Sequence, residues 1–179
     1  MNITPANLED APGIAAVHVR SWQEAYAGIL KAEFLDSLSV ERRAEQWRDI
    51  LQKQESHTVV ARKPEGVAGF VSYGHWREES AAESLGEIWA LYVHPEEWGK
   101  GLGRALLTLA VRELRSSGRH TVSLWVLTEN IRGVRFYRAF GFKPIESSSK
   151  LFQLGGTQVE EFCLRLQSDV LSTGISRAV

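Results

Sequence analysis

The sequence lacks the features that mark secreted, membrane-spanning or metal-binding chains. Cys163 is the only cysteine among 179 residues, which excludes an intrachain disulfide and fits a reducing compartment. No apolar run approaches the roughly 20 residues that a membrane-spanning helix requires. The first residues lack a basic stretch followed by an apolar one, so no secretory leader is expected. These absences predict a cytoplasmic location and no membrane partner.

Two kinds of ligand-binding motif are also missing. The five histidines are not spaced as metal ligands are, so no metal is expected. A dinucleotide fingerprint beginning at Gly99 would need glycine where the chain has Arg104, and a P-loop would need Ser or Thr where it has Gly101. The glycine-rich segment near residue 100 therefore matches neither nucleotide motif.

The net charge is only −1, but the acidic and basic side chains are unevenly distributed along the sequence. Residues 1–97 carry 16 acidic and 9 basic side chains, whereas residues 98–143 carry 2 acidic and 9 basic ones. A basic block of this size suits a polyanionic small ligand. Nucleic acid is the rival explanation, but we expect no such partner because the chain has no recognisable nucleic-acid motif and no basic overall charge.

The length and the 44% apolar content predict one globular domain over residues 1–167, followed by a frayed tail at 168–179. Helical spacing predicts helices over residues 10–27, 31–38, 40–52, 104–116 and 130–140. Alternating or continuous apolar runs predict strands over residues 57–62, 67–76, 84–93, 121–127, 142–151 and 158–166. This order indicates an α/β (α+β) protein with a mixed sheet flanked by helices.

A strand, a glycine turn and a helix follow one another between residues 84 and 116. The turn reads Trp98-Gly99-Lys100-Gly101-Leu102-Gly103-Arg104. A helix start directs unpaired N–H groups and the positive end of its dipole at an anion, and glycines let a large phosphate group approach the backbone. The alternative is a glycine turn that only packs a helix on a sheet.

A second motif lies downstream, where Asn130 and Tyr137 precede Phe140-Gly141-Phe142. Seven residues make two helical turns, so the two side chains lie near one face. Together the two motifs resemble the acetyl-CoA site of the GCN5-related N-acetyltransferase (GNAT) superfamily. Trp98 departs from the Gln or Arg usual in the family, and Gly133 departs from the usual Ala. Without the resemblance, Tyr137 would be read as a core aromatic.

The resemblance implies a GNAT fold, with a mostly antiparallel sheet of six to seven strands and splayed central strands. The strand at 84–93 should carry a bulge and diverge from its neighbour, which leaves a slot for acetyl-CoA as cosubstrate. Main-chain groups of Leu91, Tyr92 and Val93 would pair with the pantetheine arm and polarise the thioester carbonyl. The implied phosphate and pantetheine contacts are Gly99, Lys100, Gly101, Leu102, Gly103, Arg104, Asn130 and Tyr137.

The resemblance also implies catalytic roles. Tyr137 matches a general acid near the thioester sulfur, and Glu87 matches a general base of some histone-acetylating members. A salt-bridged strand carboxylate is the alternative for Glu87, and a water chain could be the base instead. Trp22 and Tyr26 would line the acceptor pocket, with His18 and Glu24 as further candidates. Core packing is the alternative for Trp22, and for His18 the sequence does not choose.

The reaction implied is transfer of acetyl from acetyl-CoA to a primary amine of a small molecule, by direct attack in a ternary complex. The acidic residues 1–97 suit a cationic acceptor. Two alternatives remain: a protein or peptide N-terminal or lysine acetyltransferase, and a non-catalytic acyl-CoA-binding module. Family members are often dimers, which leaves a homodimer open, and the sequence does not identify the acceptor.

Overall fold

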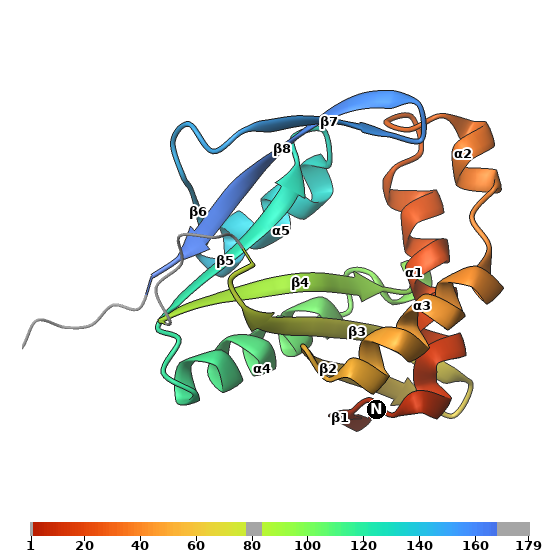
Figure 1. Ribbon diagram of the computed structural model, residues 1–179, viewed down its shortest axis with the longest axis horizontal. Coiled ribbons are helices and arrows are strands. Elements are labelled where there is room, and N and C mark those ends of the chain that lie inside the picture. The colour runs from red at the N-terminus through yellow and green to blue at the C-terminus, as the bar shows by residue number, and fades with distance from the viewer. Residues whose placement is uncertain (1, 78–83, 168–179) are drawn as a thin grey trace, which may run out of the picture.

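The computed structural model describes residues 2–77 and 84–167, so the predicted tail at 168–179 lies outside the described residues. The described residues form one eight-stranded sheet in the order β1-β2-β3-β4-β5-β8-β6, with β7 also paired to β8 (Figure 1). No helix in these two ranges is long and apolar enough to cross a membrane.

The helices are α1 (Ala11–Ala25), α2 (Ala32–Asp36), α3 (Val40–Lys53), α4 (Leu102–Ser116) and α5 (Ile131–Phe140), with short 3-10 turns η1 (Leu8–Asp10) and η2 (Pro95–Glu97). The strands are β1 (Asn2–Pro5), β2 (His57–Lys63), β3 (Gly66–His75), β4 (Leu85–Val93), β5 (Thr121–Leu127), β6 (Lys143–Pro144), β7 (Lys150–Leu154) and β8 (Thr157–Leu166). All five predicted helices are confirmed, as are five of the six predicted strands.

Two differences raise the strand number above the six or seven expected. β1 was not predicted, because its four residues gain their partner only when Asn2 aligns with Arg62 on β2. The single strand predicted over 142–151 is wrong: β6 and β7 flank a loop in which Ser147 has a positive φ of 56°. That left-handed backbone cannot continue an extended strand.

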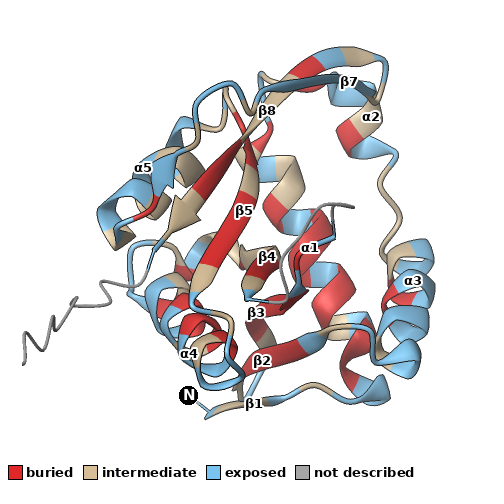
Figure 2. Cartoon of the chain, turned by 60° about the vertical axis from the view of Figure 1, so that its left-hand side comes forward, coloured by how far each residue is buried: buried red, intermediate tan, exposed pale blue. Residues whose placement is uncertain are grey.

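Helices cover both faces of the sheet, and the core lies between them. α4 packs on one face through Leu106, Leu107 and Ala110, where side chains of α5 join the same cluster. α1 and α3 pack on the other face, with Ile14 and Trp47 against Phe70 of β3. Figure 2 shows buried residues concentrated on the central strands and on the helix sides that face them.

The centre of the sheet is open. β4 and β5 are parallel and pair only over Leu85–Glu87 with Thr121–Ser123 within the described chain, after which the two strands diverge (Figure 1). The register of β3 against β4 also shifts: Ser72 aligns with Ala90 and Tyr73 with Ile88, so Trp89 forms a bulge. The predicted bulge and the predicted splay of the central strands are both confirmed.

Candidate active site

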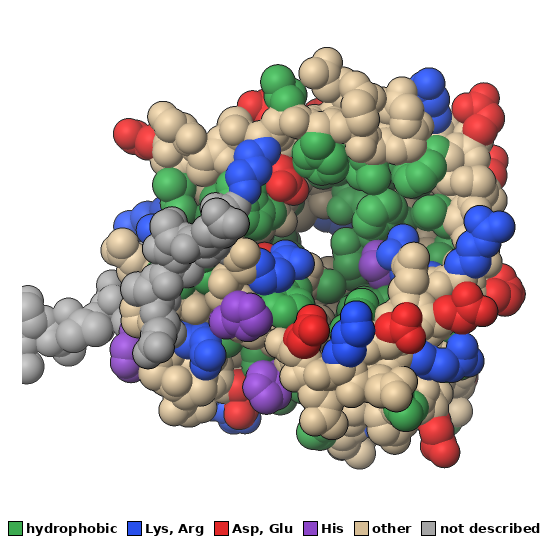
Figure 3. All heavy atoms as spheres, viewed as in Figure 1, with side chains coloured by type: hydrophobic (Ala, Val, Ile, Leu, Met, Phe, Trp, Pro, Cys, Tyr) green, Lys and Arg blue, Asp and Glu red, His purple; other side chains and the backbone are tan. Residues whose placement is uncertain are grey.

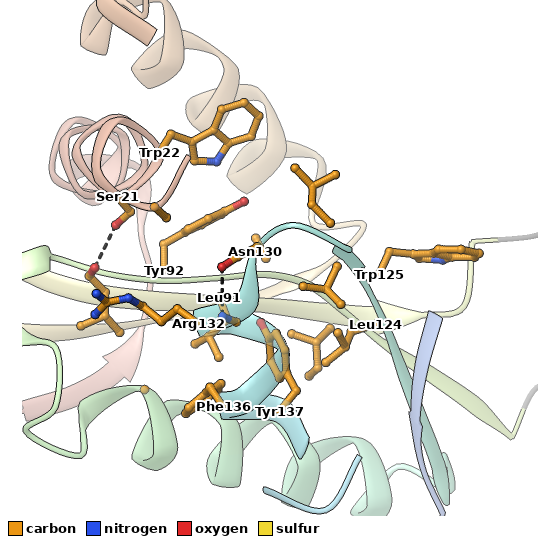
Figure 4. Close-up of a pocket in the computed structure, with 18 of the residues that line it drawn as sticks. Ser21, Trp22, Leu91, Tyr92, Leu124, Trp125, Asn130, Arg132, Phe136 and Tyr137 are labelled. Carbon is orange, nitrogen blue, oxygen red and sulfur yellow. Dashed lines mark hydrogen bonds between the residues drawn. The ribbon is translucent and has the colours of Figure 1, made fainter. Parts of the chain in front are cut away.

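A cavity of about 650 Å³ fills the opening between β4 and β5. Figure 3 shows this hollow from the outside and Figure 4 shows its interior. Many of its walls come from residues named from the sequence: Trp22, Tyr26, Leu91, Tyr92, Val93, Gly99, Gly101, Leu102, Gly103, Arg104, Asn130 and Tyr137. Segments far apart in the chain therefore meet around one space.

The edge of β4 that faces the cavity carries unpaired main-chain groups. The His94 N–H donates a hydrogen bond to the carbonyl of Ala68 on β3 at 2.8 Å. Because hydrogen-bonded pairs alternate along an antiparallel ladder, Tyr92 also faces β3, while Leu91 and Val93 face the opening. The main-chain contacts predicted for these three residues stay a prediction. Leu91 and Val93 are the two whose main-chain groups face the opening and so are accessible to a ligand.

The carbonyl of Val93 already has two donors. The hydroxyl of Ser21 on α1 and the indole N–H of Trp98 each donate to it at 2.8 Å (Figure 4 shows the bond from Ser21). Trp98 therefore ties the glycine turn to the end of β4, which is the support that a polar side chain would give at this position. The Val93 N–H remains directed at the cavity.

The glycine turn leads the chain directly into α4. Gly99 and Gly101 have φ values of 75° and 86°, a left-handed backbone that glycine adopts readily. Leu102 begins α4, so the N–H groups of its first turn point toward the cavity. The side chain of Lys100 instead bonds Glu97 at 3.3 Å, and a hydrogen bond from Lys63 lowers the pKa of Glu97.

α5 completes the cavity from the other side. The Asn130 side chain accepts a hydrogen bond from the Gly133 N–H at 3.0 Å and so caps the helix. Tyr137 points its hydroxyl into the cavity (Figure 4), and its ring packs edge-on against Phe136 and Phe142. Burial raises the pKa of Tyr137 well above its ordinary value, so the hydroxyl keeps its proton at neutral pH.

A glycine turn, an open strand edge and a tyrosine around one cavity can be compared with known families. The model of the Acetyltransferase (GNAT) family matches residues 19–142. The chain belongs to the GNAT acetyltransferase family.

Relatives of this GNAT acetyltransferase extend over most of the chain. YuaI of Bacillus subtilis (strain 168), an uncharacterized N-acetyltransferase, is 31% identical over 162 residues, 90% of each chain. The L-methionine sulfoximine/L-methionine sulfone acetyltransferase of Salmonella typhimurium (strain LT2) is 31% identical over 123 residues, 69% of this chain and 71% of the relative. The solved structure of yncA from Salmonella typhimurium with acetyl-CoA has a TM-score of 0.70 at 24% identity over 94% of both chains, a likeness in fold.

At the end of the cavity near α1, the GNAT acetyltransferase presents aromatic side chains. The rings of Trp22 and Tyr26 meet edge-on with centroids 5.2 Å apart. Burial raises the pKa of Tyr26 well above its ordinary value, and the nearby Tyr92 adds to the rise. Burial also raises the pKa of Tyr92. This end of the cavity is therefore lined by uncharged rings that carry polar tips.

His18 lies behind that wall. Its Nδ1 accepts a hydrogen bond from the Trp47 indole at 3.1 Å, and its ring stacks on Tyr92 with centroids 4.5 Å apart. Burial, aided by Arg43, lowers the pKa of His18 to about 3, so the ring is neutral. Rather than the main cavity, His18 lines a second cavity of about 330 Å³, which shares Arg77, Trp89 and Ala90 with the first.

Glu87 is buried, with 2% of its surface exposed, and is held by Arg77. Its carboxylate accepts the Arg77 backbone N–H and the Arg77 Nε–H, both at 3.1 Å, together with a further bond from Nη2. Among the described residues that line the cavity, Arg77 is present and Glu87 is not. The arrangement matches the salt-bridged alternative, and the role of Glu87 as a base stays a prediction. Glu24 forms an ion pair with Arg20 at 3.5 Å, with both side chains about half exposed.

Sequence reasoning missed several side chains of the cavity. Ser21, Arg77 and Arg132 line it, as do Trp125 of β5 and Phe152 of β7. Arg132 lies inside the basic block of residues 98–143, so charge could have indicated it. The others have no local signal, since their neighbours in space are distant in the chain.

Proposed function

We propose that this GNAT acetyltransferase moves an acetyl group from acetyl-CoA to the primary amine of a small molecule, by direct attack in a ternary complex. The observation that carries the proposal is the single cavity into which the open edge of β4, the start of α4 and the Tyr137 hydroxyl all point. Each of these three features meets a different part of acetyl-CoA.

The residues present fit the cosubstrate. The N–H groups between Gly99 and Arg104 are available for phosphate oxygens. Gly99 and Gly101 have positive φ values that favour glycine, and glycine leaves no side chain in the way. The open groups of Leu91 and Val93 pair with amides of the pantetheine arm as an added strand would. Acetyl-CoA would supply an activated thioester, and the Leu91 and Val93 N–H groups would be the donors available to stabilise negative charge on its carbonyl oxygen.

Tyr137 is the proposed general acid. A thiolate of parent pKa about 8.5 is a better leaving group when a positioned donor protonates it. The raised pKa of Tyr137 keeps that proton on the hydroxyl over the neutral range.

The proposed base is Glu87, acting through water. The amine must lose a proton of pKa near 10 before it can attack. Arg77 separates the Glu87 carboxylate from the cavity, so proton transfer has to pass the Arg77 guanidinium or follow a water chain around it. A water chain without Glu87 remains the alternative.

The acceptor end favours a small molecule with an apolar portion. Trp22, Tyr26 and Tyr92 supply uncharged surface there, and Arg77 forms an ion pair with the buried Glu87. The expected preference for cationic acceptors depends on the overall charge of residues 1–97. A relative 31% identical to this chain bears the name of an acetyltransferase for methionine sulfoximine and methionine sulfone, which supports the small-molecule class.

The test is thiol release from acetyl-CoA with a panel of acceptors, with acetyl-CoA binding measured alongside. The panel holds amino acids, methionine sulfone and sulfoximine, polyamines, aminoglycosides and peptides with free N-termini. Turnover with one small-molecule class is the expected result. Turnover confined to peptides would favour the protein acetyltransferase, and tight binding with no turnover by any acceptor would favour the acyl-CoA-binding module.

A further inference from the structure

Arg132 stands in the cavity without a carboxylate partner. It lies in the first turn of α5, and Figure 4 shows its side chain extending from α5 across the cavity. Among the described residues, none of the ion pairs includes Arg132. A cation in the first turn also faces the positive end of the helix dipole, so Arg132 does not stabilise its own helix.

The position of the guanidinium is nevertheless well defined. It stacks over the Trp98 ring, 4.1 Å from the ring centroid. Trp98 is itself held by its indole N–H, which donates to the Val93 carbonyl at 2.8 Å. The contacts run from β4 to Trp98 and from Trp98 to Arg132, so a side chain of α5 is fixed beside the glycine turn.

We propose that Arg132, stacked on Trp98, binds the diphosphate of coenzyme A from the α5 side, opposite the backbone N–H groups of Gly99 to Arg104. This assignment rests on the proposed function, because it takes acetyl-CoA as the occupant of the cavity. When the flat face of a guanidinium lies on an aromatic ring, the N–H groups at its edge stay available. Two of these N–H groups can donate in parallel to two phosphate oxygens.

The proposal also accounts for the departure at position 98. A Gln or Arg there could support the turn by a hydrogen bond, as Trp98 does through its indole N–H. Only an aromatic ring supplies, in addition, a flat surface on which Arg132 can rest. Trp98 and Arg132 therefore act as a pair: the first is a positioning residue and the second contacts the phosphate.

The experiment measures dissociation constants by calorimetry for acetyl-CoA, CoA and 3′-dephospho-CoA on the whole protein. Arg132→Gln is compared with Arg135→Gln, which removes the same charge from an exposed position of α5 outside the cavity lining. We expect Arg132→Gln to weaken all three ligands about ten- to a hundredfold, as a lost charge-assisted hydrogen bond would. Arg135→Gln should have an effect several times smaller, since it only lowers the general field.

Two further variants test the pairing. Trp98→Gln should weaken binding less than Arg132→Gln, and the double variant should bind about as weakly as Arg132→Gln alone, because both changes remove one interaction. Arg132→Lys keeps the charge but loses the fork, so it should recover only part of the affinity. Thermal unfolding of each variant, compared with the parent protein, checks that the fold is retained.

The failures are distinguishable. A parent protein that binds none of the three ligands contradicts the proposed function itself. A parent that binds them while Arg132→Gln binds equally well, or no worse than Arg135→Gln, overturns only the role of Arg132. A loss confined to ligands that carry the 3′-phosphate overturns the assignment to the diphosphate, and additive effects in the double variant overturn the pairing with Trp98.

Discussion

At the scale of single residues, Tyr137 combines a local motif with an environment that keeps it protonated. Its hydroxyl enters the cavity from α5, and burial raises its pKa. The raised pKa extends the pH range over which the hydroxyl holds a proton, which the proposed role as an acid requires.

The first prediction concerns Tyr137→Phe. This change removes the hydroxyl and keeps the ring, so we expect kcat to fall about a hundredfold while the dissociation constant of acetyl-CoA changes little. In the parent, the raised pKa should keep kcat from declining on the alkaline side until the pH exceeds the ordinary tyrosine value of about 10. Equal kcat values for the variant and the parent, with the panel acceptor that turns over, would remove Tyr137 from the chemistry.

The second prediction concerns the stability conferred by neutral His18. Its pKa is lowered from 6.5 to about 3 in the folded protein, so the unfolded chain binds the extra proton between these values. The free energy of unfolding should therefore fall as the pH falls through this window, by about 2 kcal/mol between pH 8 and pH 5 from this residue.

Urea unfolding at several pH values measures this contribution. His18→Gln keeps an acceptor for the Trp47 indole but cannot titrate, so its stability should depend less steeply on pH than that of the parent. Parallel curves for the two proteins would mean that His18 is not the group responsible.

Residues whose position in the cavity is set by local spacing could be predicted from the sequence. Gly101 and Tyr137 are examples, because a turn before a helix and two side chains on one helix face are properties of a short segment. The bond from Ser21 to Val93 spans 72 positions, and no local pattern indicates it. The ion pair between Arg77 and Glu87 could not be predicted from the sequence either. The sequence therefore left two alternatives for Glu87, a salt-bridged carboxylate and a general base.

At the scale of elements, the hairpin of β7 and β8 depends on its turn. Gly155 has a φ of 57°, and a Cβ atom there would lie 2.2 Å from the Phe34 ring carbon of α2. The turn is therefore packed directly under α2, close to the aromatic end of the cavity.

The third prediction is that Gly155→Ala lowers the free energy of unfolding by about 2 kcal/mol more than Gly118→Ala does. Gly118 also has a positive φ, of 86°, but a Cβ there meets no described atom within 4 Å. The difference isolates the contact with Phe34 from the backbone strain that both variants share. Chemical denaturation measures both values, and similar losses would show that Phe34 yields without cost.

Elements with a strong period were predictable, and those that depend on a distant partner were not. α4 buries one regular face and β3 is buried along most of its length, so helical spacing and a long apolar run indicated them. β1 is four residues long and includes Pro5, a residue type that is disfavoured within strands. β1 pairs with β2, which is more than 50 residues away in the chain, so no local pattern indicates the pairing. The loop between β6 and β7 has a positive φ at Ser147, and serine gives no strong sign of that conformation.

At the scale of the whole molecule, the sheet consists of two parts joined at one end. β1 to β4 lie with α1, α3 and α4, whereas β5 to β8 lie with α5 (Figure 1). The parallel pairing of three residues connects the two parts. A ligand lying between β4 and β5 would therefore connect the two strands over the length along which they do not pair with each other.

The fourth prediction concerns amide hydrogen exchange on β4 with and without acetyl-CoA between the two strands. The Leu91 and Val93 amides face the opening, so they should exchange quickly in the ligand-free protein and slow markedly when acetyl-CoA is present at a hundred times its dissociation constant. The Tyr92 amide already pairs with β3 and serves as the internal control. Unchanged exchange at Leu91 and Val93, with binding demonstrated in the same sample, would place the pantetheine arm elsewhere.

The hollow between the two parts of the sheet passes through the molecule, as Figure 3 shows. Two ligands can thus reach a common centre from opposite mouths, and neither has to leave before the other arrives. The kinetic expectation is that both substrates are bound before the acetyl group moves: initial-rate plots against either substrate should intersect, whereas parallel plots would mean that CoA leaves before the amine binds.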